Sequence, residues 1–283
     1  MRYIDASFTE IREEKKTTYV ALAAHNCYQV LKNDNENDFI LRLEGFKHYA
    51  VFEHGRFVAS VSKELYFELV KINDKFIDLF ECGGDYLVSF SYRPLLEKNS
   101  FGKLIDILPS YSHYMFPNHE FNKPQGRILS EEEISALPNS IYKKVKYVTI
   151  KIDTDRGVTH ELVRHRVASY AQESTRYCNY AKDKFGNEIT IIKPLDYEQF
   201  KEAYDASFKA SEEAYFKLLE LGSKPEMARA VLPTKLKATI YLTCSIEEYE
   251  HIFELRTSPR AHPDIAVIFN AVKEQFEKEG YLR

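Results

Sequence analysis

HELVRHRVASYAQESTRYCNY, residues 160–180, holds the densest set of chemically distinctive side chains in this 283-residue chain. Arg164, His165 and Arg166 are consecutive, and Arg176 follows further along. Arginine offers a planar, permanently charged fork that suits phosphate and carboxylate groups. The segment therefore indicates an anion site. Its neutral hydrogen-bonding side chains are Ser169, Gln172 and Ser174.

The start of this segment matches part of the HExxH zinc motif. His160 and Glu161 fit the first two positions, but Arg164 stands where the second histidine belongs, and His165 lies one residue further. On an α-helix that spacing rotates the two histidines about 140° apart, which is too far for one tetrahedral zinc. We therefore expect no metal site.

An anion site competes with a simpler interpretation of the same residues. On a helix, Glu161, Glu173 and the arginines can pair at helical spacing and form a solvated charged face. Consecutive helical residues also point about 100° apart. Arg164 and Arg166 are therefore expected to serve two different ligands or two neighbouring subunits.

The composition is that of an ordinary globular protein, with 44% hydrophobic and 29% charged residues. A formal net charge of −4 argues against a protein that binds nucleic acid over its whole surface. No uncharged apolar run approaches the length of about 18 residues that a membrane helix needs. The N-terminus lacks the apolar core of a secretory signal, and the four cysteines form no CxxC pair. We expect a cytoplasmic protein with reduced thiols.

The hydrophobic pattern predicts an α+β fold, a mixed sheet flanked by helices, with a helix-rich C-terminal half. Residues 93–140 show weak periodicity and receive no prediction. Strands are expected over residues 17–28, 50–60, 86–92, 146–152 and 188–194. Helices are expected over residues 62–80, 158–177, 197–221, 225–233, 245–255 and 263–280, with Ser245 as an N-cap and Gly222 as a C-terminal glycine.

Arg164-His165-Arg166, seven intervening residues and Ser174 form an RHR-x7-S pattern. This pattern resembles the signature of flavin-dependent thymidylate synthases. The resemblance extends to three further segments: HYAVFEHGRF (48–57), ARAVLP (228–233) and EYEHIFELR (248–256). It covers residues 145–270 well and 20–60 loosely. It implies one domain over 1–283, with an insertion at about 60–145.

The resemblance implies reductive methylation of dUMP to dTMP. The one-carbon donor would be 5,10-methylenetetrahydrofolate, and FAD and NADPH would be the redox cofactors. It also implies a homotetramer with shared active sites. Residues alone leave open a non-catalytic nucleotide- or RNA-binding module that uses the basic segment.

The resemblance also implies roles for individual residues. Arg256 and Ser174 are expected to be catalytic. Arg256 would face the pyrimidine, and Ser174 would position the ring without acting as a nucleophile. The residues expected to bind the cofactor are His54, Arg164, His165, Arg166, Gln172, Ser245, Ile246, Glu247 and His251. Those expected to bind the substrate are Glu161, Arg164, Gln172, Glu173, Ser174, Arg176, Arg229 and Arg256.

Several residues depart from the family pattern or have a structural alternative. Many relatives carry Asn at the position of Ala171, Glu at Gln172 and Asn at His251, and His262 replaces a family Gln. His54 is equally compatible with a hydrogen-bonded structural histidine. Arg229 has the spacing to pair with Glu226, and Cys178 is expected to be a packed thiol.

Overall fold

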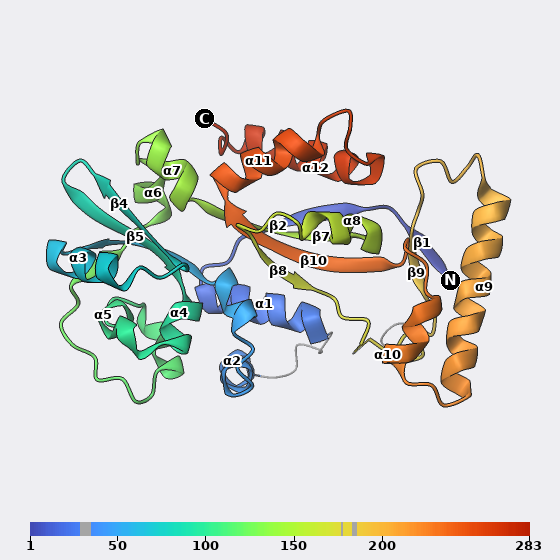
Figure 1. Cartoon of the computed structure of the whole chain (residues 1–283), viewed down its shortest axis with the longest axis horizontal. Helices are drawn as coiled ribbons and strands as arrows, with labels where there is room; N and C mark the ends of the chain where they lie inside the picture. The colour runs from blue at the N-terminus through green and yellow to red at the C-terminus, as the bar shows by residue number, and fades with distance from the viewer. Residues whose placement is uncertain (29–34, 177, 183–185) are drawn as a thin grey trace.

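The computed structural model describes residues 1–28, 35–176, 178–182 and 186–283, and these build three sheets with helices around them. Figure 1 shows the sheets in sequence from left to right: a sheet of β3–β6, a central sheet, and a two-stranded sheet beside α9. Both larger sheets are antiparallel, so the prediction of a mixed sheet is wrong. The α+β class and the helix-rich C-terminal half are confirmed.

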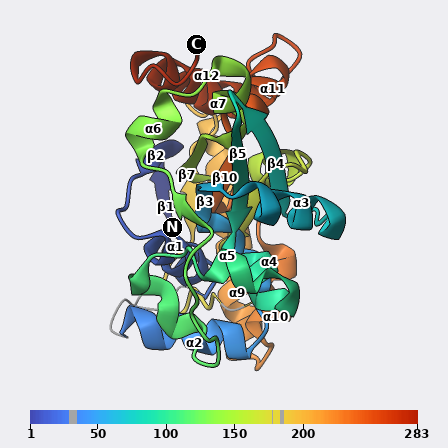
Figure 2. The ribbon, with the colours of Figure 1, turned by 90° about the vertical axis from the view of Figure 1, so that its left-hand side faces the viewer.

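The central sheet has the order β2-β7-β10-β8. Its strands are β2 (Ser7–Ile11), β7 (Tyr147–Asp155), β10 (Lys237–Ser245) and β8 (Ser169–Gln172). Side chains alternate across β10, as strand geometry requires. Ile240 and Leu242 face one side of the sheet, where they pack in the core under three helices: α8 (Arg156–Leu162), α11 (Ile246–Arg256) and α12 (Pro263–Lys278). Tyr241 faces the other side, toward α1 (Lys16–Tyr28). Turned by 90°, α11 and α12 lie at one end and α1 and α2 (Glu36–Gly45) nearer the other (Figure 2).

The second sheet has the order β4-β5-β3-β6 and is formed by residues 56–128. Its strands are β3 (Arg56–Val61), β4 (Ile77–Cys82), β5 (Asp85–Ser91) and β6 (Gly126–Ile128). Gly83 and Gly84, both at positive φ, form the tight turn between β4 and β5. Around the sheet lie α3 (Lys63–Ile72), α4 (Tyr92–Glu97), α5 (Gly102–Ile105), α6 (Glu131–Ser135) and α7 (Asn139–Val145), with short 3-10 turns at 99–101 and 110–115.

The third sheet pairs β1 (Arg2–Ile4) in parallel with β9 (Thr190–Ile192). It packs against α9 (Lys201–Glu220) and α10 (Pro225–Ala228), which runs into a 3-10 turn, η5 (Arg229–Val231). Gly222 follows α9 at φ +88°, as expected for a C-terminal glycine. The last three helices expected from the sequence are confirmed at α10 with η5, α11 and α12.

Four sequence predictions are wrong. The strand expected at 17–28 is helix α1, because its buried residues follow helical spacing: Val20, Ala21, Ala23 and Ala24. Residues 49–54 form a 3-10 helix, η1 (Tyr49–His54), before β3 begins. The helix expected at 62–80 ends at Ile72, where Asn73 takes a left-handed conformation, and β4 follows. The helix expected at 158–177 ends at Leu162, because residues 169–172 pair with β10; Tyr177 lies outside the described residues.

Candidate active site

Helix α8 is fixed to the end of β7 by Asp155. The Asp155 carboxylate accepts a hydrogen bond from the Val158 amide at 2.9 Å and forms an ion pair with Lys235, also at 2.9 Å. The Gln172 amide donates to the Thr159 hydroxyl at 2.9 Å, which ties α8 to β8. The first helical turn therefore has a fixed position over the edge of the central sheet.

After α8 the chain turns and enters β8, and the RHR residues lie in this turn. The Tyr170 hydroxyl fixes the turn, since it lies 2.8 Å from the Leu162 carbonyl oxygen and 3.1 Å from that of His165. His165 is 5% exposed, whereas Arg164 and Arg166 are exposed. The helix on which we based the zinc and arginine arguments does not extend to these residues. Neither arginine lines the three cavities of the described residues that are discussed below.

His165, Arg256 and Glu161 form a compact polar cluster. The Arg256 Nε donates to His165 Nε2 at 3.0 Å, and its Nη1 donates to Glu161 Oε2 at 2.9 Å. Its Nη2 also donates to the Glu161 carbonyl oxygen at 3.1 Å. Because arginine only donates, His165 Nε2 must carry a lone pair. Burial, with the charges of Arg256 and His251 nearby, lowers the pKa of His165 to about 4, so its imidazole is neutral at physiological pH.

Two further side chains surround His165. The His251 ring lies 5.8 Å from it, centroid to centroid, in an edge-on arrangement. Glu248 Oε1 lies 3.7 Å from His165 Nδ1, and burial raises the pKa of Glu248. The sequence analysis treated Glu248 only as part of a helix cap. Glu248 lies one helical turn before the predicted site residue His251, and this spacing was the sequence signal that could have identified it.

A cleft of about 670 Å³ opens beside this cluster, between α8 and residues 229–236, and we call it the arginine cleft. Three predicted substrate residues line it, namely Glu161, Gln172 and Arg229. Arg229 Nη1 donates to the Thr175 hydroxyl at 3.0 Å. Among the described residues it makes no ion pair with Glu226. The lining residues that sequence reasoning missed are Arg156, Thr159, His160 and Thr175.

The segment after β8 divides into a buried and an exposed part. Glu173 is 3% exposed, and its carboxylate contacts Lys237 Nζ at 2.9 Å and the Thr239 amide at 3.3 Å. The Ser174 hydroxyl accepts from the Arg176 amide at 3.3 Å, and the Arg176 side chain is exposed. The predicted contact of Glu173 with substrate thus competes with an ion pair inside the protein.

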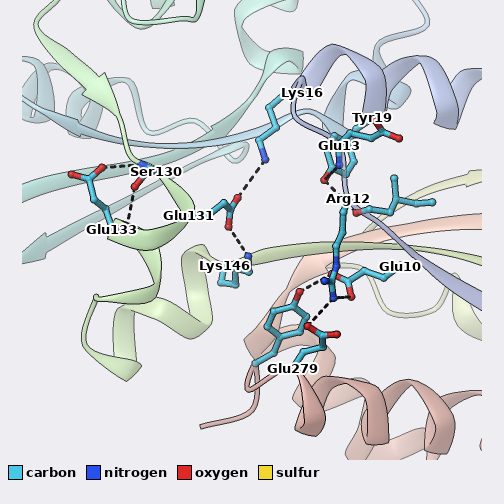
Figure 3. A network of polar contacts seen from close by, with 12 residues as sticks. Glu10, Arg12, Glu13, Lys16, Tyr19, Ser130, Glu131, Glu133, Lys146 and Glu279 are labelled. Carbon is cyan, nitrogen blue, oxygen red and sulfur yellow. Dashed lines mark hydrogen bonds and ion pairs between the residues drawn. The ribbon is translucent and has the colours of Figure 1, made fainter.

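His54 lies elsewhere, in a cavity of about 410 Å³ that we call the N-terminal cavity. Its Nδ1 is 2.7 Å from the Thr243 hydroxyl, and burial lowers the pKa of His54 to about 4. In Figure 3, dashed lines join Glu131 to both Lys16 and Lys146, and Arg12 to both Glu10 and Glu279. Glu131 contacts Lys146 Nζ at 2.6 Å and Lys16 Nζ at 3.6 Å. Arg12 contacts Glu10 at 2.7 Å and Glu279 at 2.9 Å.

The predicted cofactor residues at the start of α11 differ in exposure. The Ser245 hydroxyl caps the helix by accepting from the Glu248 amide at 3.3 Å. Ile246 is fully buried in the core, and Glu247 is exposed. Ser245 and Glu247 line a third cavity of about 460 Å³, which we call the α11 cavity. Its other walls include Val167 and Tyr147.

Metal ligands and membrane helices were also sought in the parts of the chain that the structure describes. No group of three or more His, Cys, Asp or Glu side chains there is arranged to hold a metal ion. In the same residues, no helix is both long and apolar enough to cross a bilayer. The four cysteines, all among the described residues, form no disulfide, and Cys178 is buried as expected.

Comparisons with known proteins identify the family. Residues 135–279 match the family model described as thymidylate synthase complementing protein. The flavin-dependent thymidylate synthase of Pyrococcus furiosus is 30% identical over 204 residues, covering 70% of this chain and 80% of the relative. That of Sulfurisphaera tokodaii is 36% identical over 145 residues, covering 51% and 53%.

Among solved structures, a UMP/dUMP methylase from Streptomyces cacaoi, bound with 5-Br UMP, covers 98% of this chain and 92% of its own. Its TM-score of 0.45 and identity of 15% are too low to carry an argument about the site. The family model spans more than half of the chain, and the Pyrococcus furiosus relative is matched over four-fifths of its length. This chain therefore belongs to the flavin-dependent thymidylate synthase family.

Proposed function

We propose that this protein methylates dUMP reductively to dTMP, with 5,10-methylenetetrahydrofolate as the one-carbon donor and with FAD and NADPH as redox cofactors. Family membership supports the reaction. The observation that carries the assignment to this site is the arginine cleft, which joins Arg229 to the Glu161–Arg256–His165 cluster. Its volume falls within the range of about 300–1,000 Å³ that is typical of small-ligand sites.

The cleft suits the phosphate end of a nucleotide. Arg229 lines it, and among the described residues the hydrogen-bond partner of its guanidinium is a neutral hydroxyl, that of Thr175. A guanidinium without a carboxylate partner forms strong charge-assisted hydrogen bonds with a phosphate. Gln172 and Glu161 line the same cleft and offer polar groups to the sugar or the base.

Arg256 suits the pyrimidine end. Glu161 and His165 hold its guanidinium in one orientation, and because His165 is neutral, Glu161 is the partner of these two that offsets the positive charge of Arg256. A fixed positive charge at the N3–C4–O4 edge would favour the ionised form of that edge, which makes the ring a better carbon nucleophile at C5 or a better hydride acceptor. Ser174 would position the ring. It has no base within hydrogen-bonding distance among the described residues, so we assign it no covalent role.

The flavin would be held by the RHR turn together with the start of α11. The α11 cavity fits this assignment, because apolar side chains such as Leu79 and Phe80 form one wall and the polar residues Ser245 and Glu247 form another. A flat aromatic ring system suits such a mixed lining. When bound, the flavin supplies the hydride that completes the methyl group.

A homotetramer with shared active sites is part of the proposal. Arg164, Arg166 and Arg176 are exposed in the single chain. Val163 and Val167, on either side of the RHR residues, are 39% and 72% exposed. Exposed apolar side chains around charged groups are typical of surfaces that another subunit covers. A neighbouring subunit would turn these arginines into walls of a closed site.

The decisive experiment is anaerobic NADPH oxidation by the purified protein, with and without dUMP and methylenetetrahydrofolate. We expect a bound yellow cofactor, NADPH consumption that depends on dUMP, and release of tritium from [5-³H]dUMP. A colourless protein that binds polyanions in a salt-sensitive way supports the nucleic-acid-binding alternative instead. A yellow protein that never releases the C5 proton of dUMP contradicts the proposed substrate.

A further inference from the structure

Arg156 is a charged residue of the arginine cleft to which neither the resemblance nor the sequence patterns give a role. It is the first residue of α8 and lines the cleft with Arg229. Its Nη1 is buried, and within the described part of the chain it has no hydrogen-bond partner. Its guanidinium also forms no ion pair with any described carboxylate. A buried donor on a charged group is costly to leave unsatisfied.

The carboxylates near the cleft are already paired with other cations. Asp155 contacts Lys235 Nζ at 2.9 Å, and Glu173 contacts Lys237 Nζ at 2.9 Å. Glu161, the carboxylate that lines the cleft itself, contacts Arg256 Nη1 at 2.9 Å. Within the part of the chain that the structure describes, two guanidinium groups of one cleft therefore have no carboxylate partner.

The backbone fixes Arg156 close to the segment that carries Arg229. The Arg156 amide donates to the Thr234 carbonyl oxygen at 3.1 Å. At Gly157, an added Cβ would come within 3.0 Å of both Asp155 Oδ1 and Thr234 Cγ2. The glycine therefore permits the close approach between the start of α8 and residues 229–236. These contacts hold the segments that carry the two arginines close together, and both arginines line the same cleft.

We propose that Arg156 and Arg229 together bind the phosphate of the substrate nucleotide, and that Arg156 makes the site selective for a nucleoside monophosphate over a nucleoside. This inference rests on the proposed function for the identity of the nucleotide. The phosphate supplies the acceptor that the buried Arg156 Nη1 lacks. Two guanidinium groups also favour the dianion of a phosphate monoester over the monoanion, so binding strengthens as pH rises through about 6.

The test compares Arg156→Gln with the wild type in binding two ligands, dUMP and deoxyuridine, to the flavin-loaded enzyme. We expect dUMP affinity to fall about 10- to 100-fold, which corresponds to one lost charge-assisted contact. Deoxyuridine lacks the phosphate, so its affinity should change less than about twofold. Arg156→Lys should recover part of the dUMP affinity. Arg127→Gln, at an exposed ion pair with Glu133 on the second sheet, is the matched control and should bind both ligands as the wild type does.

Equal weakening of dUMP and deoxyuridine in Arg156→Gln assigns Arg156 a structural role and overturns the proposal, as does unchanged binding of dUMP. Arg156→Lys is the fallback if Arg156→Gln does not fold, and its selectivity for dUMP over deoxyuridine is read in the same way. If the wild type turns over no dUMP, the proposed function fails independently of this site. Inorganic phosphate is then the probe: binding that requires Arg156 supports the phosphate site, and Arg156-independent binding overturns it.

Discussion

The arginine cleft and the N-terminal cavity are both lined by charged side chains, but their charges are satisfied in different ways. In the N-terminal cavity, Glu131 lies between Lys16 and Lys146, and Arg12 lies between two glutamates. In the arginine cleft, Arg156 and Arg229 form no ion pair with any described residue. The first arrangement balances its charges within the protein, whereas in the second we propose that a phosphate supplies the missing anion. Local pairing, more than the number of charges, therefore separates the candidate ligand site from the structural cavity.

The largest effect that would test this comparison is expected at Arg256. Arg256→Ala removes a charge that Glu161 and His165 hold in place, so we expect kcat/KM for dTMP formation to fall by at least about 10²–10³. The Glu161 side chain is 38% exposed and can be solvated when its partner is lost, so the fold should persist. The matched control is Arg12→Ala, which breaks ion pairs of the N-terminal cavity and should leave kcat/KM within about twofold. Equal losses in the two variants would remove the distinction.

A second effect concerns acid stability and His54. The folded-state pKa of about 4 lies below the ordinary value of 6.5, so protonation favours the unfolded state. Stability is therefore full above about pH 6.5 and falls as the pH drops toward 4, by up to about 2–3 kcal/mol for His54. In His54→Gln, the free energy of unfolding measured with urea should therefore decrease less between pH 7 and pH 4 than in the wild type. His262→Gln, at an exposed side chain, should leave this decrease unchanged. If His54→Gln loses as much stability between pH 7 and pH 4 as the wild type does, protonation of His54 is not the cause of the acid sensitivity.

Arg229 provides a third test, with an expected effect on affinity and not on stability. Arg229→Gln loses one hydrogen bond to Thr175 within the protein but both of its possible bonds to phosphate. We expect dUMP affinity to fall about 10- to 50-fold with little change in melting temperature. Lys146→Met is the counterpart in the N-terminal cavity and should show the reverse, with lower stability and unchanged affinity. Calorimetric titration measures the dUMP affinity of both variants, and thermal unfolding measures their melting temperatures.

The smallest effect is expected at Glu131. Burial raises its pKa, but contact with Lys146 and Lys16 outweighs burial, so the folded-state pKa is lower than the ordinary value. Its stabilising contribution is present above the unfolded pKa and is lost as pH falls through the folded pKa. Glu131→Gln should therefore cost about 1 kcal/mol or less near neutral pH, and nothing in strong acid. A loss that persists unchanged in strong acid would show that the ion pairs are not its origin.

The sequence predicted those parts of the fold that depend on local signals. Helix α11 begins at the predicted cap Ser245, α12 begins at Pro263, and Gly222 follows α9. The failures lie where distant contacts decide. Residues 169–172 form a strand because β10 offers them hydrogen-bonding partners, which no local spacing reveals. Strand β10 itself received no prediction, although it is the most buried strand of the central sheet.

The site was predictable in its residue types but not in its grouping. The resemblance to the family pointed to Arg256, His165 and Glu161, and the structure brings these three into contact. The pattern did not indicate that His54 occupies a separate cavity or that Arg164 and Arg166 are exposed in one chain. Arg156 was missed because its significance depends on what it lacks, namely a partner, and that is a property of the folded chain.

Strand β10 supports several residues of the proposed site. Lys237 and Thr239 hold Glu173 near one end, Thr243 contacts His54 further along, and Ser245 starts the helix that carries Arg256. Eight residue steps at about 3.3 Å set a length of about 26 Å for this strand. Lengthening the strand by one residue would shift the contacts near Lys237 relative to those near Ser245, and it would turn Thr243 to the opposite face of the sheet. Point substitutions in β10 leave this spacing intact, so we expect a change of length to disturb the relative positions of these contacts more than a change of side chain.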